Sequence, residues 1–462
     1  MKLKFSGGFA NLSTIFFTDQ LLVSFGNWLY WLAVSRLTTS SEIGEATIVI
    51  SLVLLINSLA QLGLEYPLLK KSSIDKSRIV GTVITIELLI TLVSLPLVYY
   101  VLFEQSLQEF FWISVVILLI SGIAFVPRFA LFGNSKAKSV LIIDVASTVL
   151  KFVIAYVLVS FGLGANGMLL SILAQILLVA VASLIVLSRS NFSFHLGDVN
   201  YFKKIVADGV ANFPSKLSRV LILSISVVLL GLFGVSSSEI GIYYVALVIG
   251  MIGASVSASM AFMVIPASLA SKEELLSDSM RLGLSFSAPI IAALIVAPKF
   301  ILSLFGVEYA SGYALLIILS LAIFPSCIVL NTITKLNYAN KQKALLAIGS
   351  TEVISFFIAF FFLVPLNGLI GAAVSVLIAF TVSSIISVIM WSQRELTKYI
   401  IRSGIATFIG ILTGYTAGLL FELPPVILII VSAGTSLALV IKLKNTSLNE
   451  IMQFVSSILK ST

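Results

Sequence analysis

The feature that most constrains this chain is a succession of long apolar segments, separated by short polar breaks, along almost the whole sequence. A helix needs about 20 mostly apolar residues to cross a bilayer. Segments of this kind predict helices at 10–35, 44–66, 79–102, 111–133, 139–161, 166–187, 206–232, 240–268, 281–304, 311–334, 344–364, 369–391, 401–419 and 424–442. We therefore predict an all-α polytopic membrane protein with about fourteen transmembrane helices and only short connections.

Composition and charge agree with this class and exclude others. Hydrophobic residues make up 59% of the chain and charged residues 10%, whereas a soluble domain carries roughly 25% charged residues. The net charge of +8 is spread along the chain and forms no basic domain, so we expect no nucleic-acid partner. Cys327 stands alone in an apolar segment, which excludes a disulfide framework and a thiolate metal site.

The distribution of basic residues predicts the orientation in the membrane. Lys and Arg concentrate in cytoplasmic loops, and here they fill alternate connections, as at Lys70 and Lys71 or Lys203 and Lys204. The intervening loops carry acidic residues such as Glu42 and Glu239. Both termini are therefore predicted to be cytoplasmic.

The sequence also contains an internal repeat. The segment SSEIG at 40–44 recurs at 237–241, and the pattern NSKAK at 134–138 is echoed by NKQKA at 340–344. We predict a six-helix lobe at 1–190, a cytoplasmic linker at 191–205, a second six-helix lobe at 206–392, and two extra helices with a tail at 393–462. Six helices return the chain to the same side, so the two lobes should run parallel, related by a pseudo-twofold axis along the membrane normal. Such a duplication is typical of transporters, which bind their substrate between the repeats; a channel or a membrane-embedded enzyme does not usually need it.

Ionisable residues inside the apolar segments are the candidate site residues, because each costs roughly 2.5–3.5 kcal/mol on insertion scales. Lys216 and Arg219 are three residues apart and share one helix face. Arg binds phosphate oxygens bidentately and Lys adds a point charge, so this pair suits a diphosphate. The alternative is that both side chains snorkel to the cytoplasmic surface. The 197-residue repeat offset aligns Asp19 with Lys216, so we predict that they pair across the pseudo-twofold axis and that substrate phosphates displace Asp19. The alternative is that Asp19 is an unrelated carboxylate at a helix end.

Four further charged positions remain, with a fifth at a helix end. Asp144 and Lys151 are two helical turns apart and can line one cavity wall. Glu87 and Glu352 are either proton or sodium sites that couple transport to a gradient, or carboxyl groups held neutral among helices. Arg128 is a candidate substrate-binding residue at the cytoplasmic end of its segment, and positive-inside anchoring explains it equally well.

Several segments resemble a known family. The run LAVSRLTTSSEIGEATIVISLVLLINSLAQLGLEYPLLKK, the motif FGNSKAK and the second-half segment FGVEYASGYALLIILSLAIFP resemble the polysaccharide (Wzx-like) branch of the multidrug/oligosaccharidyl-lipid/polysaccharide exporter superfamily. The resemblance implies a flippase in the bacterial cytoplasmic (inner) membrane. It would carry an undecaprenyl-diphosphate-linked oligosaccharide to the outer leaflet for O-antigen or capsule assembly. It also implies glycosyltransferase and polymerase partners.

Three rival functions remain open at this point. Lipid II flippases share the count of fourteen helices, and a cation-coupled drug exporter would have a more acidic cavity. A membrane-embedded glycosyltransferase or polymerase is disfavoured because the outside loops are too short for a catalytic site. The glycine pattern at 162–167 lies in a turn between apolar helices rather than after a strand, and no Walker-type sequence is present. We therefore expect no enzyme activity, no cofactor and no metal.

Overall fold

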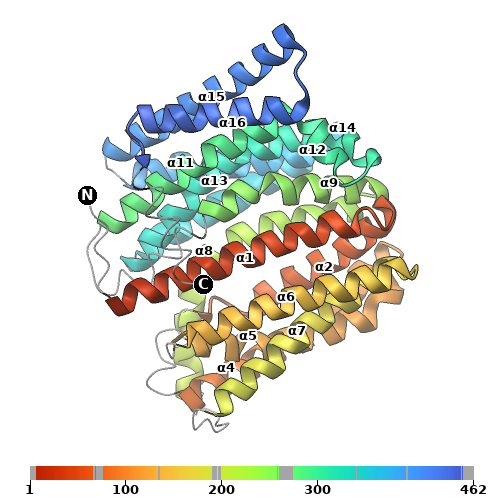
Figure 1. Cartoon of the computed structure of the whole chain (residues 1–462). Coiled ribbons are helices and arrows are strands. Elements are labelled where there is room, and N and C mark those ends of the chain that lie inside the picture. The colour runs from red at the N-terminus through yellow and green to blue at the C-terminus, as the bar shows by residue number, and fades with distance from the viewer. Residues whose placement is uncertain are drawn as a thin grey trace. The chain divides into compact units, whose positions relative to one another are not determined.

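The computed structural model describes residues 7–65, 68, 76–133, 136–189, 195, 199–257, 259, 274–339, 341–391, 394–448 and 450. Throughout these residues the regular secondary structure is helical (Figure 1). The helices are α1 Gly7–Val34, α2 Ser40–Ala60, α4 Lys76–Glu104, η1 Gln108–Phe110, α5 Phe111–Gly133, α6 Ala137–Ser160, α7 Gly164–Ser188, α8 Val199–Leu232, α9 Ser237–Gly250, α11 Glu274–Val296, α12 Pro298–Ser303, η2 Val307–Gly312, α13 Tyr313–Tyr338, α14 Gln342–Trp391, α15 Arg394–Phe421 and α16 Pro425–Lys442.

The predicted class of all-helical membrane protein is confirmed. Within the described ranges, ten helices are long and apolar enough to cross a membrane. The total of fourteen and the cytoplasmic termini stay predictions. Gly368 has φ 52° and ψ −127° inside the 50-residue α14, so the helical conformation is interrupted between the predicted ranges 344–364 and 369–391. The glycine permits this backbone because it has no Cβ.

Several helices differ from their predicted bounds, and the starts of α8 and α2 show why. Helix α8 begins at Val199, seven residues before the predicted start at 206 and inside the predicted linker. The prediction followed apolar residues alone, and the first turns of α8 carry Lys203 and Lys204. Helix α2 begins at Ser40 rather than 44, because Thr39 and Glu42 form a capping box that satisfies backbone N–H groups at its start.

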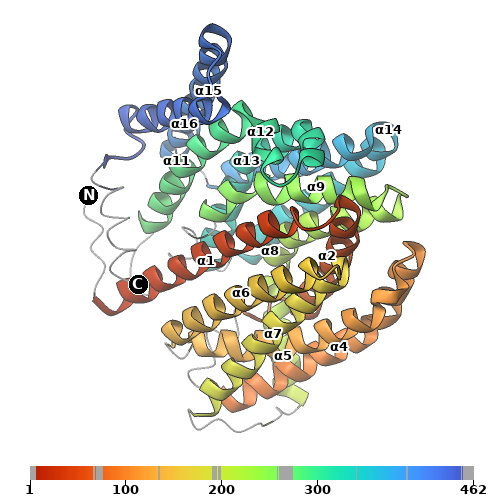
Figure 2. The same ribbon diagram turned by 45° about the vertical axis from the view of Figure 1, so that its right-hand side comes forward.

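The chain forms two compact units. The N-terminal unit comprises Phe25–Tyr244. Within it α7 packs against α5 and α6, while α2 packs against α4, α5, α7 and α8. Figure 2 shows α5, α6 and α7 side by side. This unit contains the described polar groups that the site is built from.

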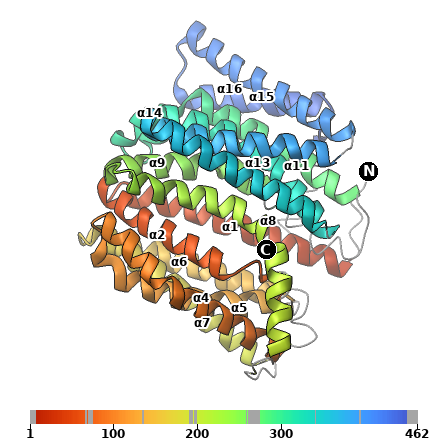
Figure 3. The same cartoon turned by 180° about the vertical axis from the view of Figure 1, so that it is seen from behind.

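The C-terminal unit comprises Met1–Ser24 and Val245–Thr462. Helix α13 packs against α14 and α11, and the pair α15 and α16 packs on α11 (Figure 3). The division into two six-helix lobes and two added helices stays a prediction, because it follows the repeat in the sequence rather than these units.

The two copies of the SSEIG repeat lie against each other. The Ser40 and Ser238 Oγ atoms are 2.7 Å apart. A Cβ added at Gly44 would lie 1.7 Å from the Ser237 carbonyl oxygen, and one at Gly241 would lie 2.1 Å from that of Ser40. The contact is reciprocal, since each glycine admits the backbone of the other copy.

Candidate functional site

Lys151 is a buried cation on α6 that contacts α1. It lies near the middle of α6, and 5% of the residue is exposed. Its ammonium group donates a hydrogen bond to Asn27 Oδ1 on α1 and lies 4.6 Å from the centre of the Tyr30 ring. The partners of Lys151 among the described residues are therefore an amide oxygen and an aromatic face, and both are electrically neutral.

Tyr30 is itself held from the other side. Its hydroxyl lies 3.4 Å from Ser171 Oγ on α7, and its ring packs edge-on against Trp31 at 5.0 Å. Only 1% of Tyr30 is exposed. Helices α1, α6 and α7 thus fix the ring under the Lys151 ammonium, where a cation–π contact is worth more than at an exposed site.

The second cation, Arg128 on α5, is paired with Asp144 on α6. The Arg128 Nε atom lies 3.1 Å from Asp144 Oδ1 and 2.8 Å from Oδ2, and Nη2 also bonds Oδ2. The Asp144 side chain is 6% exposed and that of Arg128 is 21% exposed. This is the two-pronged guanidinium–carboxylate geometry that gives strong charge-assisted hydrogen bonds.

The local sequence of α6 explains how its groups share one face. Asp144, Ser147, Thr148 and Lys151 are all buried, and their spacing of three, four and seven residues places them on one stripe. Thr148 also approaches α1 closely, because a Cβ at Gly26 would lie 2.4 Å from its Cγ2. Helices α1 and α6 therefore meet along the polar stripe.

The three remaining predicted carboxylates are all buried: Asp19 on α1 is 0% exposed, Glu352 on α14 is 0% exposed and Glu87 on α4 is 1% exposed. Glu87 faces α5, since its Oε2 lies 3.4 Å from the position of a Cβ at Gly122. Across the described residues, no group of three His, Cys, Asp or Glu side chains could hold a metal ion.

Lys216 and Arg219 lie within α8, but their side chains lie outside the part of the structure that is described. The predicted diphosphate pair and its contact with Asp19 therefore stay predictions. The structure joins Arg128 to Asp144, a pair that the sequence did not predict. Sequence reasoning also missed Asn27, Tyr30 and Ser171, because it searched the apolar segments for ionisable residues alone; an amide inside the first apolar segment was the available signal.

A second buried polar cluster lies in the C-terminal unit. Asn331 on α13 donates to Ser257 Oγ at 3.1 Å and accepts from Ser279 Oγ at 3.0 Å. Asn331 also donates to the Cys327 carbonyl oxygen at 2.8 Å. These hydrogen bonds satisfy both the amide nitrogen and the amide oxygen of Asn331. The cluster therefore joins helices, and its side chains are uncharged.

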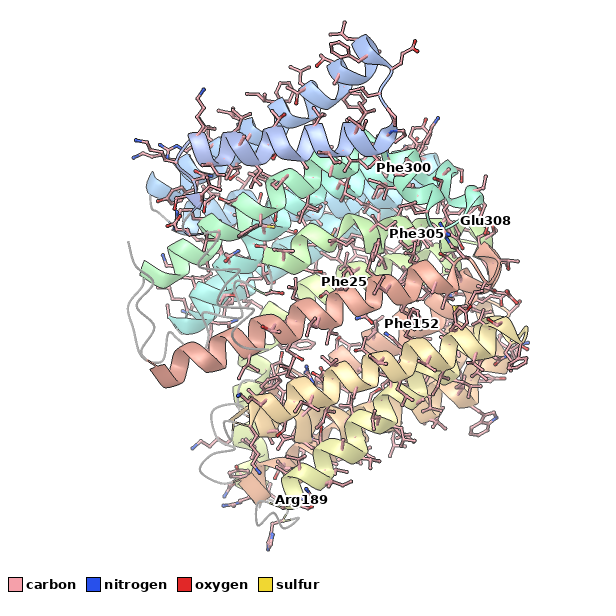
Figure 4. All side chains as sticks on the ribbon, viewed as in Figure 1. Phe25, Phe152, Arg189, Phe300, Phe305 and Glu308 are labelled. Carbon is pink, nitrogen blue, oxygen red and sulfur yellow. The ribbon has the colours of Figure 1, made fainter. Side chains whose placement is uncertain are left out.

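Side chains of neighbouring helices fill the space between the ribbons within each unit, and Arg189 at the end of α7 points away from its helix (Figure 4). Among the described cations of the N-terminal unit, Arg189 and Lys138 are exposed at helix ends, whereas Lys151 is buried and Arg128 is partly buried. The arrangement suits the binding of an anion by Lys151, because the partners of its amino group among the described residues are neutral and leave a protonated ammonium for an anion to neutralise.

Comparisons with known proteins fit this picture. The sequence model of the family described as "Polysaccharide biosynthesis protein" matches residues 33–312. No curated protein sequence matches the chain. The fold is similar to that of the lipid II flippase MurJ in an inward closed conformation, with a TM-score of 0.70, 15% identity, and coverage of 93% of this chain and 98% of that one.

Two multidrug-type structures are also similar. An inward-facing MATE family multidrug resistance transporter of the MOP superfamily has a TM-score of 0.55, 14% identity, and coverage of 86% of this chain and 97% of that one. A MATE protein in a bent conformation has a TM-score of 0.54, 15% identity, and coverage of 87% of this chain and 100% of that one. These likenesses confirm the predicted superfamily fold. The neighbours are named as a flippase and as transporters.

Proposed function

Because the chain belongs to the family of polysaccharide biosynthesis proteins, we propose that it is a flippase for a polyprenyl-diphosphate-linked oligosaccharide repeat unit. It moves this lipid from the cytoplasmic to the periplasmic leaflet of the bacterial inner membrane by alternating access. The glycan then enters O-antigen or capsular polysaccharide assembly, supplied and consumed by glycosyltransferase and polymerase partners.

The observation that carries the proposal is the buried Lys151 ammonium with neutral partners. A charged side chain at the middle of a membrane helix costs roughly 2.5–3.5 kcal/mol on insertion scales. An amide oxygen and an aromatic ring offset part of that cost, but they do not neutralise the charge. An anionic ligand would neutralise it, and the diphosphate of a lipid-linked glycan supplies such an anion within the membrane interior.

The other predicted positions have secondary roles in this proposal. Lys216 and Arg219 add cationic charge from α8, and Asp19 is their partner before the substrate arrives. Glu87 and Glu352 are candidate proton or sodium sites, buried on α4 and α14. Arg128 is held by Asp144, so we assign it to the framework of the site rather than to the substrate.

The direction of transport follows from charge. Moving one elementary charge through 100 mV is worth about 2.3 kcal/mol. An anionic lipid that leaves a negative-inside cell therefore gains energy for each net charge that no co-transported cation cancels. The proposal needs no nucleotide-driven step.

The test is leaflet-resolved accumulation of radiolabelled lipid-linked glycan in cells that express the wild type, Lys151→Met or Lys138→Met at matched levels. Lys138 is an exposed cation on the same helix and serves as the control. We expect Lys151→Met to trap glycan on the cytoplasmic face and Lys138→Met to behave as the wild type. Normal translocation by Lys151→Met would refute the assigned role of Lys151.

Two rival substrates need their own arm of the experiment. The fold similarity to a lipid II flippase makes the lipid-linked peptidoglycan precursor the first alternative, and a cationic drug is the second. Complementation of cells depleted of their lipid II flippase would favour the first. Drug resistance that persists in Lys151→Met would favour the second, because a cationic drug has no use for a buried ammonium group.

A further inference from the structure

The contact between Asn27 and Lys151 carries an inference beyond the assignment of Lys151 itself. The Lys151 ammonium donates to Asn27 Oδ1, and Asn27 is on α1, 124 positions away in the sequence. Asn27 is partly exposed whereas Lys151 is buried. Asn27 is therefore the more accessible of the two partners, because the Tyr30 ring, which lies 4.6 Å from the ammonium, is only 1% exposed.

The other cation of α5 and α6 gives an internal comparison. Arg128 has a carboxylate partner in Asp144, with Nε–Oδ2 at 2.8 Å, so its charge is cancelled within the protein. Lys151 lies two turns beyond Asp144 on α6, and its hydrogen-bond partner is an amide rather than a carboxylate. Asn and Asp have nearly the same size and shape, but the amide keeps the neighbouring charge available to an incoming anion.

We propose that Asn27 is a specificity-determining residue that holds Lys151 in place without neutralising it, and that a phosphate oxygen of the ligand displaces the Asn27 amide. This inference rests on the proposed function for the identity of the ligand as a phosphate-bearing lipid. Displacement is feasible because a phosphate oxygen carries negative charge and therefore accepts a stronger hydrogen bond from the ammonium than the neutral amide oxygen does. Tyr30, fixed by Ser171 at 3.4 Å, keeps the ammonium in position during the exchange.

The proposal makes a sharp distinction between two substitutions at one position. In Asn27→Asp the new carboxylate pairs with Lys151, so an anion must compete against a full charge that is already in contact. In Asn27→Ala the ammonium loses a neutral partner and its charge stays available. A role for Asn27 in packing alone predicts the opposite order, because Asp preserves the shape and Ala does not.

The experiment uses the purified full-length protein in detergent micelles and measures binding of undecaprenyl diphosphate by native mass spectrometry. Inorganic pyrophosphate is titrated in parallel, so that recognition of the diphosphate is separated from recognition of the lipid tail. We expect Asn27→Asp and Lys151→Met each to weaken lipid binding by about tenfold or more. Asn27→Ala should weaken it less than Asn27→Asp does, because the ammonium loses one positioning contact but keeps its charge. Pyrophosphate should compete with the lipid on the wild type and on Asn27→Ala.

A double variant and a folding control keep the result interpretable. Asn27→Asp combined with Lys151→Met should bind no more weakly than either single variant, because both act on the same charge. Each variant is first checked for a single cooperative thermal transition by tryptophan fluorescence. Binding by Asn27→Asp equal to that of the wild type, or loss of binding in Asn27→Ala equal to that in Asn27→Asp, would overturn the proposal.

The same set of variants separates this inference from the proposed function. If glycan translocation depends on Lys151 but Asn27→Asp binds and translocates as the wild type does, the flippase function stands and the role of Asn27 fails. If diphosphate binding follows the expected order but the wild type moves no lipid-linked glycan, the role of Asn27 stands and the flippase function fails.

Discussion

The pairing of Arg128 with Asp144 allows a quantitative test of how the site is held together. The Arg128 Nε atom contacts both carboxylate oxygens, at 3.1 and 2.8 Å, and the Asp144 side chain is 6% exposed. Removing one partner of a buried ion pair costs about 3–5 kcal/mol, because the other charge is left without compensation. The Arg128 side chain is 21% exposed, so we take the lower end of that range, about 3 kcal/mol, for each single variant.

The measurement is a double-mutant cycle with Arg128→Met, Asp144→Asn and the combined variant. The free energy of unfolding is followed by titration with sodium dodecyl sulfate in mixed micelles. The loss in the combined variant should fall short of the sum of the two single losses by a coupling energy of about 3 kcal/mol. Lys138→Met, which removes an exposed cation from the same helix, should change the stability by less than about 0.5 kcal/mol. Losses that add to within about 0.5 kcal/mol would refute a coupled pair.

Two further predictions concern other parts of the fold. Gly241→Ala places a Cβ 2.1 Å from the Ser40 carbonyl oxygen, so we expect a loss of about 1–3 kcal/mol in the unfolding titration; Gly404→Ala, whose Cβ would meet nothing within 4 Å, should be neutral or slightly stabilising. Burial alone would raise the pKa of Glu450, but hydrogen bonds from Arg281 and its charge outweigh burial and lower it. A lowered pKa stabilises the fold above the ordinary value of 4.5 and stops doing so as the pH falls through the folded-state value. The difference in thermal midpoint between the wild type and Glu450→Gln should therefore be present at neutral pH and disappear in acid, and a difference that grows in acid would contradict it.

The helices were predictable because lipid leaves the backbone few choices. A segment such as 111–133 must satisfy its N–H and C=O groups internally, and α5 spans Phe111–Gly133 as predicted. Helix α8 was predicted too short because helix continues beyond the membrane into a polar segment, where hydropathy gives no signal. The repeat was visible in the sequence, but the sequence did not show that each glycine, Gly44 and Gly241, allows the backbone of the other copy to approach closely.

The site was predictable in its charges and not in its partners. An ionisable residue in an apolar segment is conspicuous, which is how Lys151 and Asp144 were found. Their partners depend on the rotation and register of packed helices. The Arg128 and Asp144 pair joins positions sixteen apart on two helices, and that pairing is absent from any one-dimensional pattern. Asn27, which contacts Lys151, is uncharged, so the pattern of ionisable residues did not indicate it.

The different partners of the two cations have a thermodynamic consequence for the whole fold. Asp144 compensates Arg128 in the empty protein, so ligand binding adds little there. Lys151 has neutral partners, so the empty protein bears part of the cost of a buried charge, and a bound anion removes it. A ligand that binds the folded state stabilises it by about 2.7 kcal/mol at a hundred times its Kd. Because Asn27→Asp would supply the missing negative charge from within the chain, that variant should be no less stable than the wild type without ligand and should gain less from the ligand. At position 27 a carboxylate would therefore favour the stability of the protein without ligand, whereas the amide of Asn27 favours stabilisation by a bound anion.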